Sequence, residues 1–186
     1  MSVYFVFIDN FSDGIVNRSD IESWLVQVPP YLQVPDPIQP GVEYDRGRLM
    51  LFLTYEWIKI CIHRPFYRRT SSTLRCPSWA TVATDESDRA ATRILDLIRA
   101  YDVIGQLQWI PLSAIPIMFS AGTIFAYQAD RLRGESRAAA MMSFEETTSL
   151  LTTVEFTWQC AGQARAILEQ HRRQMNSEGG LEVRYA

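Results

Sequence analysis

Apolar positions along this chain recur mostly at helical spacing, and their longest dense run covers residues 49–66. Within that run, the polar side chains of Glu56, Lys59 and His63 are three and four residues apart, so they share one narrow stripe of a helix. A helix that is apolar around most of its circumference is typical of a buried, central helix. The pattern therefore predicts a central helix over about residues 45–63.

A proline indicates where this helix ends. Pro65 disfavours the α conformation at Arg64, so the helix is predicted to stop there. His63 and Arg64 then lie at the C-terminal end, where cationic groups face the negative end of the helix dipole. We interpret His63-Arg64-Pro65-Phe66 as a corner between two helices.

Other apolar stripes with helical spacing lie before and after residues 49–66. In the clearest of them, over residues 85–104, Arg93 is expected on the exposed side, opposite the apolar face. Helices are predicted over residues 17–28, 85–104, 110–133, 137–151 and from 151 to about 174, with a break near Trp158.

Capping and stop signals predict the ends of these helices. Thr84 or Ser87 is expected to cap the helix that starts near residue 85, and Gly105 to end it. Residues 143–146 match a capping box, S-x-x-E, and Gly134 is expected to end the helix before it.

The remaining segments lack helical periodicity. Residues 31–44 are expected to form a proline-rich connector on the surface, and residues 68–75 a basic, exposed loop. Residues 1–16 form an atypical N-terminal segment, and residues 176–186 a disordered tail. The sequence therefore predicts an all-α fold, an irregular array of about five to seven helices, in a partial domain over residues 17–175.

Composition agrees with one packed domain and argues against some classes of function. Of the 186 residues, 47% are hydrophobic and 21% charged, which suffices for a core. The net charge of −3 gives no strong field to attract nucleic acid. The apolar run over residues 115–129 is shorter than the roughly 20 residues of a membrane span, so no membrane partner is expected.

No metal, cofactor or catalytic site is predicted. The three cysteines are dispersed without a C-x-x-C pair, and with only two histidines no zinc-site spacing is present. His63 as a general base oriented by Glu56 or Lys59 would make a helical enzyme. A helix-end histidine bonded to backbone or solvent is the favoured interpretation, because no nucleophile or glycine-rich loop lies near it in sequence.

Several short motifs, in their order, resemble the later part of the fungal-specific transcription factor domain, the middle homology region of fungal zinc-cluster transcription factors. The passage W-L followed by P-P-Y-L, the helix ending I-C-I-H-R-P-F, the A-A-x-x-I helix, the F-S-A-G segment and the last W-Q-C-A helix carry the resemblance, over residues 21–174. Arg89 departs from it where cysteine is frequent. The motif residues with an expected structural role are Trp24, Pro29, Pro30, His63, Arg64, Pro65, Phe66, Phe119, Gly122 and Trp158.

The resemblance implies a regulatory or interaction domain that takes part in the regulation of transcription. The expected partners are proteins of the transcription machinery, a related regulator, or a small metabolite bound between helices. The family's DNA contact and its zinc belong to an N-terminal six-cysteine cluster that this sequence does not contain, so neither is expected from this chain. The family also implies the nucleus, with the cytosol as the alternative for a truncated product.

The early helices of the family's domain have no counterpart in residues 1–17, so a truncated product or a late-starting gene model is expected. A helical array without its first layer would expose apolar surface to a partner. The alternative to a regulatory domain is therefore a truncated inhibitor that pairs with full-length relatives. An in-frame six-cysteine cluster in the genomic DNA upstream of Met1 would identify a fragment of a DNA-binding regulator.

Arg68-Arg69-Thr70-Ser71 matches a basophilic kinase pattern, R-R-x-S, and makes Ser71 a candidate phosphorylation site. A phosphate there would pair with the neighbouring arginines. An ordinary solvated arginine loop is the favoured alternative. Phosphopeptide mapping of the protein from its native cells decides between them, since an unmodified Ser71 and unmodified hydroxyl neighbours would reject the phosphorylation hypothesis.

Overall fold

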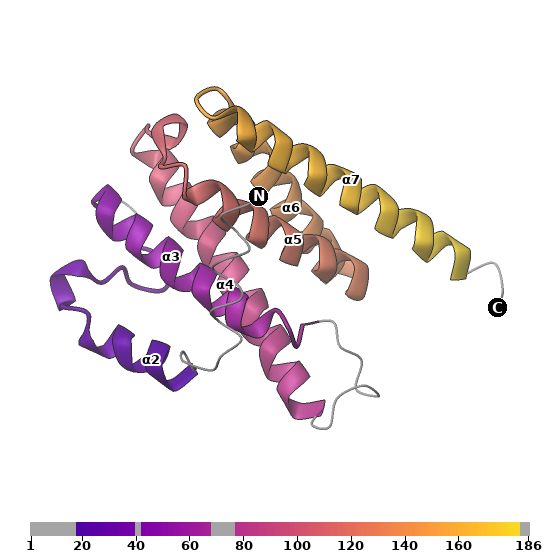
Figure 1. Cartoon of the computed structure of the whole chain (residues 1–186), viewed down its shortest axis with the longest axis horizontal. Helices are drawn as coiled ribbons and strands as arrows, with labels where there is room; N and C mark the ends of the chain where they lie inside the picture. The colour runs from indigo at the N-terminus through magenta and orange to yellow at the C-terminus, as the bar shows by residue number, and fades with distance from the viewer. Residues whose placement is uncertain (1–17, 40–41, 68–76, 183–186) are drawn as a thin grey trace, which may run out of the picture.

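The computed structural model describes residues 18–39, 42–67 and 77–182, and within these ranges all regular structure is helical (Figure 1). The predicted all-α array of five to seven helices is confirmed. The predicted N-terminal segment and the whole of the predicted basic loop, including Ser71, lie outside the described residues. The elements are α2 (Arg18–Gln27), η1 (Pro30–Leu32), α3 (Arg46–His63), α4 (Pro77–Val103), η2 (Leu107–Trp109), α5 (Ala114–Arg131), α6 (Gly134–Glu155) and α7 (Gln159–Glu182), where η marks a 3₁₀-helix.

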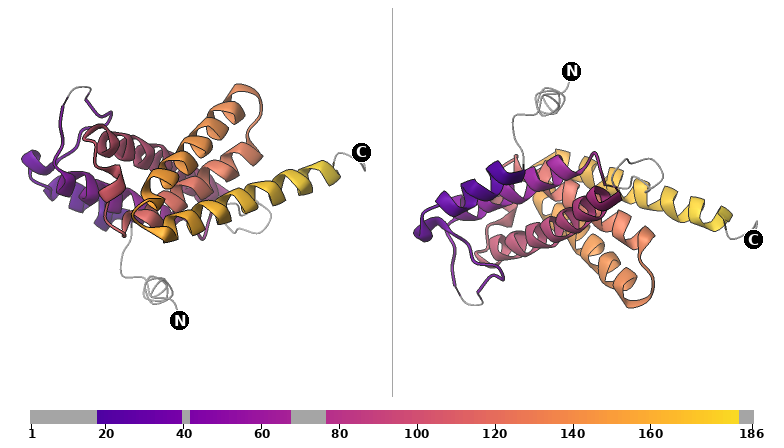
Figure 2. Two further views of the ribbon diagram at one scale, coloured as in Figure 1. Left: turned by 90° about the horizontal axis from the view of Figure 1, so that it is seen from above. Right: turned by 90° about the horizontal axis from the view of Figure 1, so that it is seen from below.

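Helix α5 is the centre of the array, because it contacts α3, α4, α6 and α7. Helices α3 and α4 pack against each other on one side of it, and α6 and α7 pack against each other on the other. In both views of Figure 2 the violet α2 and the yellow α7 lie towards opposite ends of the molecule. No helix among the described residues is both long enough and apolar enough to cross a membrane.

The prediction that the helix over residues 45–63 is the central one was wrong. Helix α3 forms extensive contacts only with α2, α4 and α5, among the described residues. The side chains of Ile58 and Ile62 stay partly exposed. Its buried face instead includes the expected polar stripe, since Glu56 and His63 are only 5% and 7% exposed. Periodicity identified the stripe correctly, but it could not show that the stripe faces inward.

The ends of α3 follow from two local causes. Asp45 caps the helix, because its carboxylate accepts hydrogen bonds from the backbone N–H groups of Gly47 at 2.7 Å and Arg48 at 3.3 Å. Arg64 keeps helical dihedral angles, against the prediction from Pro65, and its N–H donates to Ile60 at 2.8 Å. The helix ends after it because proline has no N–H to continue the ladder.

Helix α4 begins at Pro77, eight residues before the predicted start near residue 85. Thr84 and Ser87 are therefore interior residues and not caps: the Thr84 hydroxyl donates to the carbonyl of Ala80 at 2.7 Å, and Ser87 is fully buried. Proline is favoured at the first helical position, where its missing N–H costs nothing. The predicted stop at Gly105 is confirmed, with φ of +67°.

The proline-rich connector does not lie wholly on the surface, as was predicted. Val34 and Tyr44 are buried in the core. Arg93, which was expected on the exposed side of its helix, is 5% exposed and donates to the carbonyl of Val34 at 3.1 Å. A second hydrogen bond joins Arg93 to Pro35. The connector thus covers α4 and supplies carbonyl groups that compensate the burial of a guanidinium group.

The capping box predicted over residues 143–146 is not formed. Ser143 lies in the middle of α6, and Glu146 pairs instead with Arg99 of α4 at 2.6 Å. Gly134, with φ of +59°, opens α6 and does not end α5. The predicted break near Trp158 is confirmed, since α6 ends at Glu155 and α7 starts at Gln159. Helix α7 continues to Glu182, through much of the stretch predicted to be a disordered tail.

A close approach of α7 to α5 gives a prediction about stability. A Cβ added at Gly122 would meet Leu168 Cδ1 at 2.7 Å, and Leu168 is 1% exposed. A Cβ at Gly162 would meet only the Glu155 carboxylate, which would have to turn aside from its partly exposed ion pair with Arg165, a contact that contributes little to stability. We expect Gly122→Ala to be less stable than Gly162→Ala by about 1–3 kcal/mol, because both gain helix propensity but only one overpacks the core. Urea denaturation measures this difference, and equal stabilities would show that Leu168 repacks freely.

Candidate functional site

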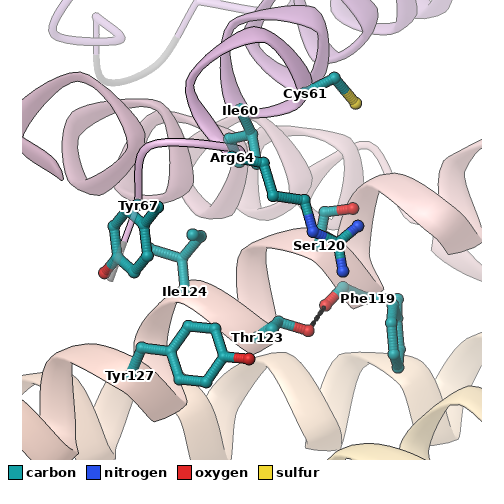
Figure 3. A pocket seen from close by; sticks show the side chains of 9 residues that line it. All are labelled: Ile60, Cys61, Arg64, Tyr67, Phe119, Ser120, Thr123, Ile124 and Tyr127. Atoms are coloured by element: carbon teal, nitrogen blue, oxygen red, sulfur yellow. Dashed lines mark hydrogen bonds between the residues drawn. The ribbon is translucent and has the colours of Figure 1, made fainter. Parts of the chain in front are cut away.

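Two adjoining pockets lie where the C-terminal end of α3 meets α5 and α7, and Figure 3 shows the residues that line the first of them. The first has a volume of about 140 Å³ and lies between α3 and α5. The second, of about 300 Å³, lies between α5 and α7. The two share four lining residues and form one continuous depression. We call it the α3–α5–α7 groove and define it by the shared residues Arg64, Phe119, Thr123 and Tyr127.

The α3 corner is held over α5 by the residue that follows the H-R-P-F sequence. Tyr67 is buried, and its hydroxyl donates to Asp88 of α4 at 2.9 Å. Asp88 also pairs with Arg131 of α5 at 2.5 Å. Backbone hydrogen bonds from Phe66 and Tyr67 to the carbonyl of His63 close the turn. These contacts fix the direction in which Arg64 leaves the helix.

Among the described residues, Arg64 is the only lysine or arginine that lines the groove, His171 is the one histidine, and no aspartate or glutamate lines it. In Figure 3 its side chain extends from α3 towards the α5 wall, next to Ser120 and Phe119. Within the part of the chain that the structure describes, no carboxylate lies within ion-pair distance of this guanidinium group. The groove therefore carries a positive charge without an internal counter-charge.

The hydroxyl groups on the α5 wall are acceptors towards the groove. Ser120 donates its proton to the carbonyl of Pro116 at 2.8 Å and accepts from the indole N–H of Trp57 at 3.1 Å. Thr123 donates its proton to the carbonyl of Phe119 at 2.9 Å. Each hydroxyl has one proton, so the oxygen atoms that remain for a ligand are hydrogen-bond acceptors.

Cys61 lies at the α3 edge of the first pocket and is partly buried. Burial raises the pKa of its thiol, and the nearby Arg64 guanidinium opposes that effect in part. A thiol that stays protonated is a weak nucleophile, so this arrangement does not suit nucleophilic catalysis.

His63 lies outside the groove and is buried. Its Nδ1 atom is 2.8 Å from the carbonyl oxygen of Lys59, the backbone contact expected of a helix-end histidine. A carbonyl only accepts, so this contact places a proton on Nδ1. Lys59 itself pairs with Glu56, Nζ to Oε2 at 2.6 Å, and lies over the Tyr55 ring. The polar side chains of this stripe therefore form their contacts within α3 itself.

Of the residues singled out by the sequence, the structure brings Arg64 and Phe119 together in the groove. The others lie at separate junctions between elements. Trp24 stacks on Tyr55 with ring centroids 5.4 Å apart, and Gly122 packs under Leu168. The Trp158 indole donates to the carbonyl of Ile110 at 2.9 Å. The exposed motif residues are Trp24, Pro29, Pro30, Arg64, Pro65 and Phe66.

Sequence reasoning missed the polar and aromatic residues of the α5 wall. Phe119, Thr123 and Tyr127 are each four residues apart, which puts them on one face of a helix. This stripe is less apolar than the rest of α5. That difference could have predicted that the stripe faces solvent. His171, which meets Tyr127 edge to face at 5.4 Å, carried no such signal.

No group of three or more histidine, cysteine, aspartate or glutamate side chains in the described ranges is arranged to hold a metal ion. No family model matches the chain, and no curated protein or solved structure matches it either. The resemblance to the fungal transcription factor domain therefore stays a prediction from the motifs.

The buried carboxyl group of Glu56 leads to a prediction about pH. Desolvation raises its pKa above the usual 4.5, although Lys59 and Arg93 oppose the shift. Between 4.5 and the raised value the folded state binds more protons than the unfolded chain, so this group makes the free energy of unfolding fall as pH rises through that window. We expect Glu56→Gln to remove this fall.

The measurement is the difference in free energy of unfolding between wild type and Glu56→Gln, from denaturation below pH 4.5 upwards. The difference should decrease with rising pH and then level off. Glu43→Gln, at an exposed glutamate of the connector, is the control. A difference that increases with pH would show that the attraction of Lys59 outweighs desolvation.

Proposed function

We propose that this chain is a regulatory interaction domain of the kind found in fungal zinc-cluster transcription factors, acting in the nucleus. It takes part in the regulation of transcription through partner proteins or a bound effector, and not through its own contact with DNA. The ordered motifs over residues 21–174 support this proposal. Their residues lie at junctions between helices, such as Trp24 on α3 and Gly122 under α7.

One observation carries most of the weight. Arg64, from the H-R-P-F motif, and Phe119, from the F-S-A-G motif, are 55 positions apart in the sequence and line the same groove. A structural motif alone would place its residues in the core. Here two motifs contribute side chains to a surface depression, which favours a role in recognition.

A second feature supports contact with a protein partner. At one end of the array, the Trp158 indole joins the α6–α7 turn to the chain just after η2. Large apolar side chains are exposed in this region, which is unfavourable unless a partner covers them. We call this the apolar end and define it by Val103, Trp109, Leu112 and Phe156.

The alternative of an inhibitor that pairs with related regulators would use the same end of the molecule. It differs in its target, since the partner would be another regulator and the compartment could be the cytosol. A helical enzyme using His63 has less support, because the Nδ1 atom of His63 is already bonded to the carbonyl of Lys59. No further observation favours that function.

A reporter experiment tests the proposal. The chain is fused to a heterologous DNA-binding domain, and transcription of the reporter gene is measured in a fungal host. We expect the fusion to change transcription relative to the DNA-binding domain alone. Val103→Ser, at a side chain that is 84% exposed at the apolar end, should reduce that change at least about twofold, on the scale of one lost interface contact of about 0.5–1 kcal/mol.

The matched control is Val26→Ser in α2, where the side chain is 83% exposed and far from the apolar end in sequence. It removes the same methyl groups from a surface of equal exposure, so it should leave the reporter signal unchanged. No effect of the unaltered fusion on transcription would contradict the proposed function. Equal effects of the two valine variants would contradict only the role of the apolar end.

A further inference from the structure

The charge of the α3–α5–α7 groove points to an anionic ligand. Arg64 extends from α3 towards the α5 wall (Figure 3), and among the described residues no carboxylate lines the groove. Arg64 is exposed to solvent, and the side chains of Ile60, Phe119 and Ile124 line the groove beside it. A ligand with one negative charge would neutralise the single arginine, whereas a dianion would leave excess charge in the groove.

The hydrogen-bonding groups distinguish a carboxylate from a phosphate. Ser120 and Thr123 donate their protons to backbone carbonyls, so they offer lone pairs and would repel further anionic oxygen atoms. The donors on the α3 side come from the planar guanidinium group of Arg64, whose geometry matches the two oxygens of one carboxylate. Because this geometry also fits two oxygens of a phosphate, the preference for a carboxylate rests on the single charge of Arg64 and on the acceptor oxygens of Ser120 and Thr123.

Size and shape favour a small molecule with an apolar body. The two pockets, of about 140 and 300 Å³, lie at or below the lower end of the roughly 300–1,000 Å³ typical of small-molecule sites. Beside Arg64, the aromatic rings of Phe119 and Tyr127 line both pockets. An acyl chain or a ring placed between them buries apolar surface while the carboxylate stays on the arginine.

We propose that the α3–α5–α7 groove binds a small monocarboxylic acid, with its carboxylate on Arg64 and its apolar body against Phe119 and Tyr127. In the regulatory domain such an acid would be the effector, a role that rests on the proposed function. Binding itself does not rest on it, because binding is measured without any transcription.

Two cysteines allow the site to be tested directly in the whole chain. Cys61 lines the first pocket, whereas Cys160 is exposed at the start of α7 and outside both pockets. The rate of alkylation of each is followed by mass spectrometry of its peptide. Phenylacetate and hexanoate are the probes. At least one should slow the alkylation of Cys61 and leave that of Cys160 unchanged.

Phenylacetamide tests the charge, because it has nearly the shape of phenylacetate and is neutral. The concentration of phenylacetamide that protects Cys61 should be about tenfold higher than that of phenylacetate, since a charge-assisted hydrogen bond is roughly twice as strong as a neutral one. Equal protection by the amide and the acid would contradict the role of the carboxylate. No protection of Cys61 by either acid would overturn the proposal.

Arg64→Gln should raise the concentration of acid needed for protection at least about tenfold, while Arg137→Gln should not change it. Arg137 is an exposed arginine of α6 outside the groove, so the two variants lose the same charge. Arg64 also affects the thiol of Cys61, so rates are compared with and without acid within each variant. Unchanged protection in a folded Arg64→Gln protein would overturn the proposal. A silent reporter fusion would leave this binding result intact.

Discussion

The fold depends on the burial of α5 from several sides. Ala121 and Gly122 give this helix a narrow face, and α7 comes close enough there that Leu168 fills the space a side chain would occupy. Met118 and Phe125 supply bulk to the core. Because the interior must be filled without gaps, this alternation of small and large residues determines how the neighbouring helices can approach. The positions of α3, α4, α6 and α7 follow from it.

The groove is a consequence of this arrangement and of one proline. Helix α3 crosses α5 and has to end before the chain can return to form α4. The missing N–H of Pro65 ends it, yet Arg64 keeps a helical backbone and so leaves the helix towards α5. Tyr67 then ties the corner to Asp88. Between the end of α3 and the middle of α7, the surface of α5 is left uncovered, and the groove forms there.

The helices, but not their environments, could be predicted from the sequence. The α5 helix and the break near Trp158 follow from periodicity, since they depend on residues close together in the chain. Burial of Arg93 could not be predicted in this way, because its compensation comes from the carbonyl groups of Val34 and Pro35, almost 60 positions earlier. Glu146 likewise looked like a helix cap until its partner Arg99 was known. Local patterns do not contain the partner that decides the role of a charged residue.

The same reasoning separates three arginines that stabilise the fold from Arg64, which lines the groove. Arg93 has the connector carbonyls, Arg99 has Asp96 and Glu146, and Arg131 has Asp88. Each of these side chains uses its donors within the molecule. Arg64 lies in a partly apolar depression next to hydroxyl groups whose protons are already donated. An acid bound there would pair its carboxylate with Arg64 and at the same time bury apolar surface of the groove, which a carboxylate on an open surface would not do. The groove therefore differs from these three sites in that, among the described residues, no carboxylate lies within ion-pair distance of its guanidinium group.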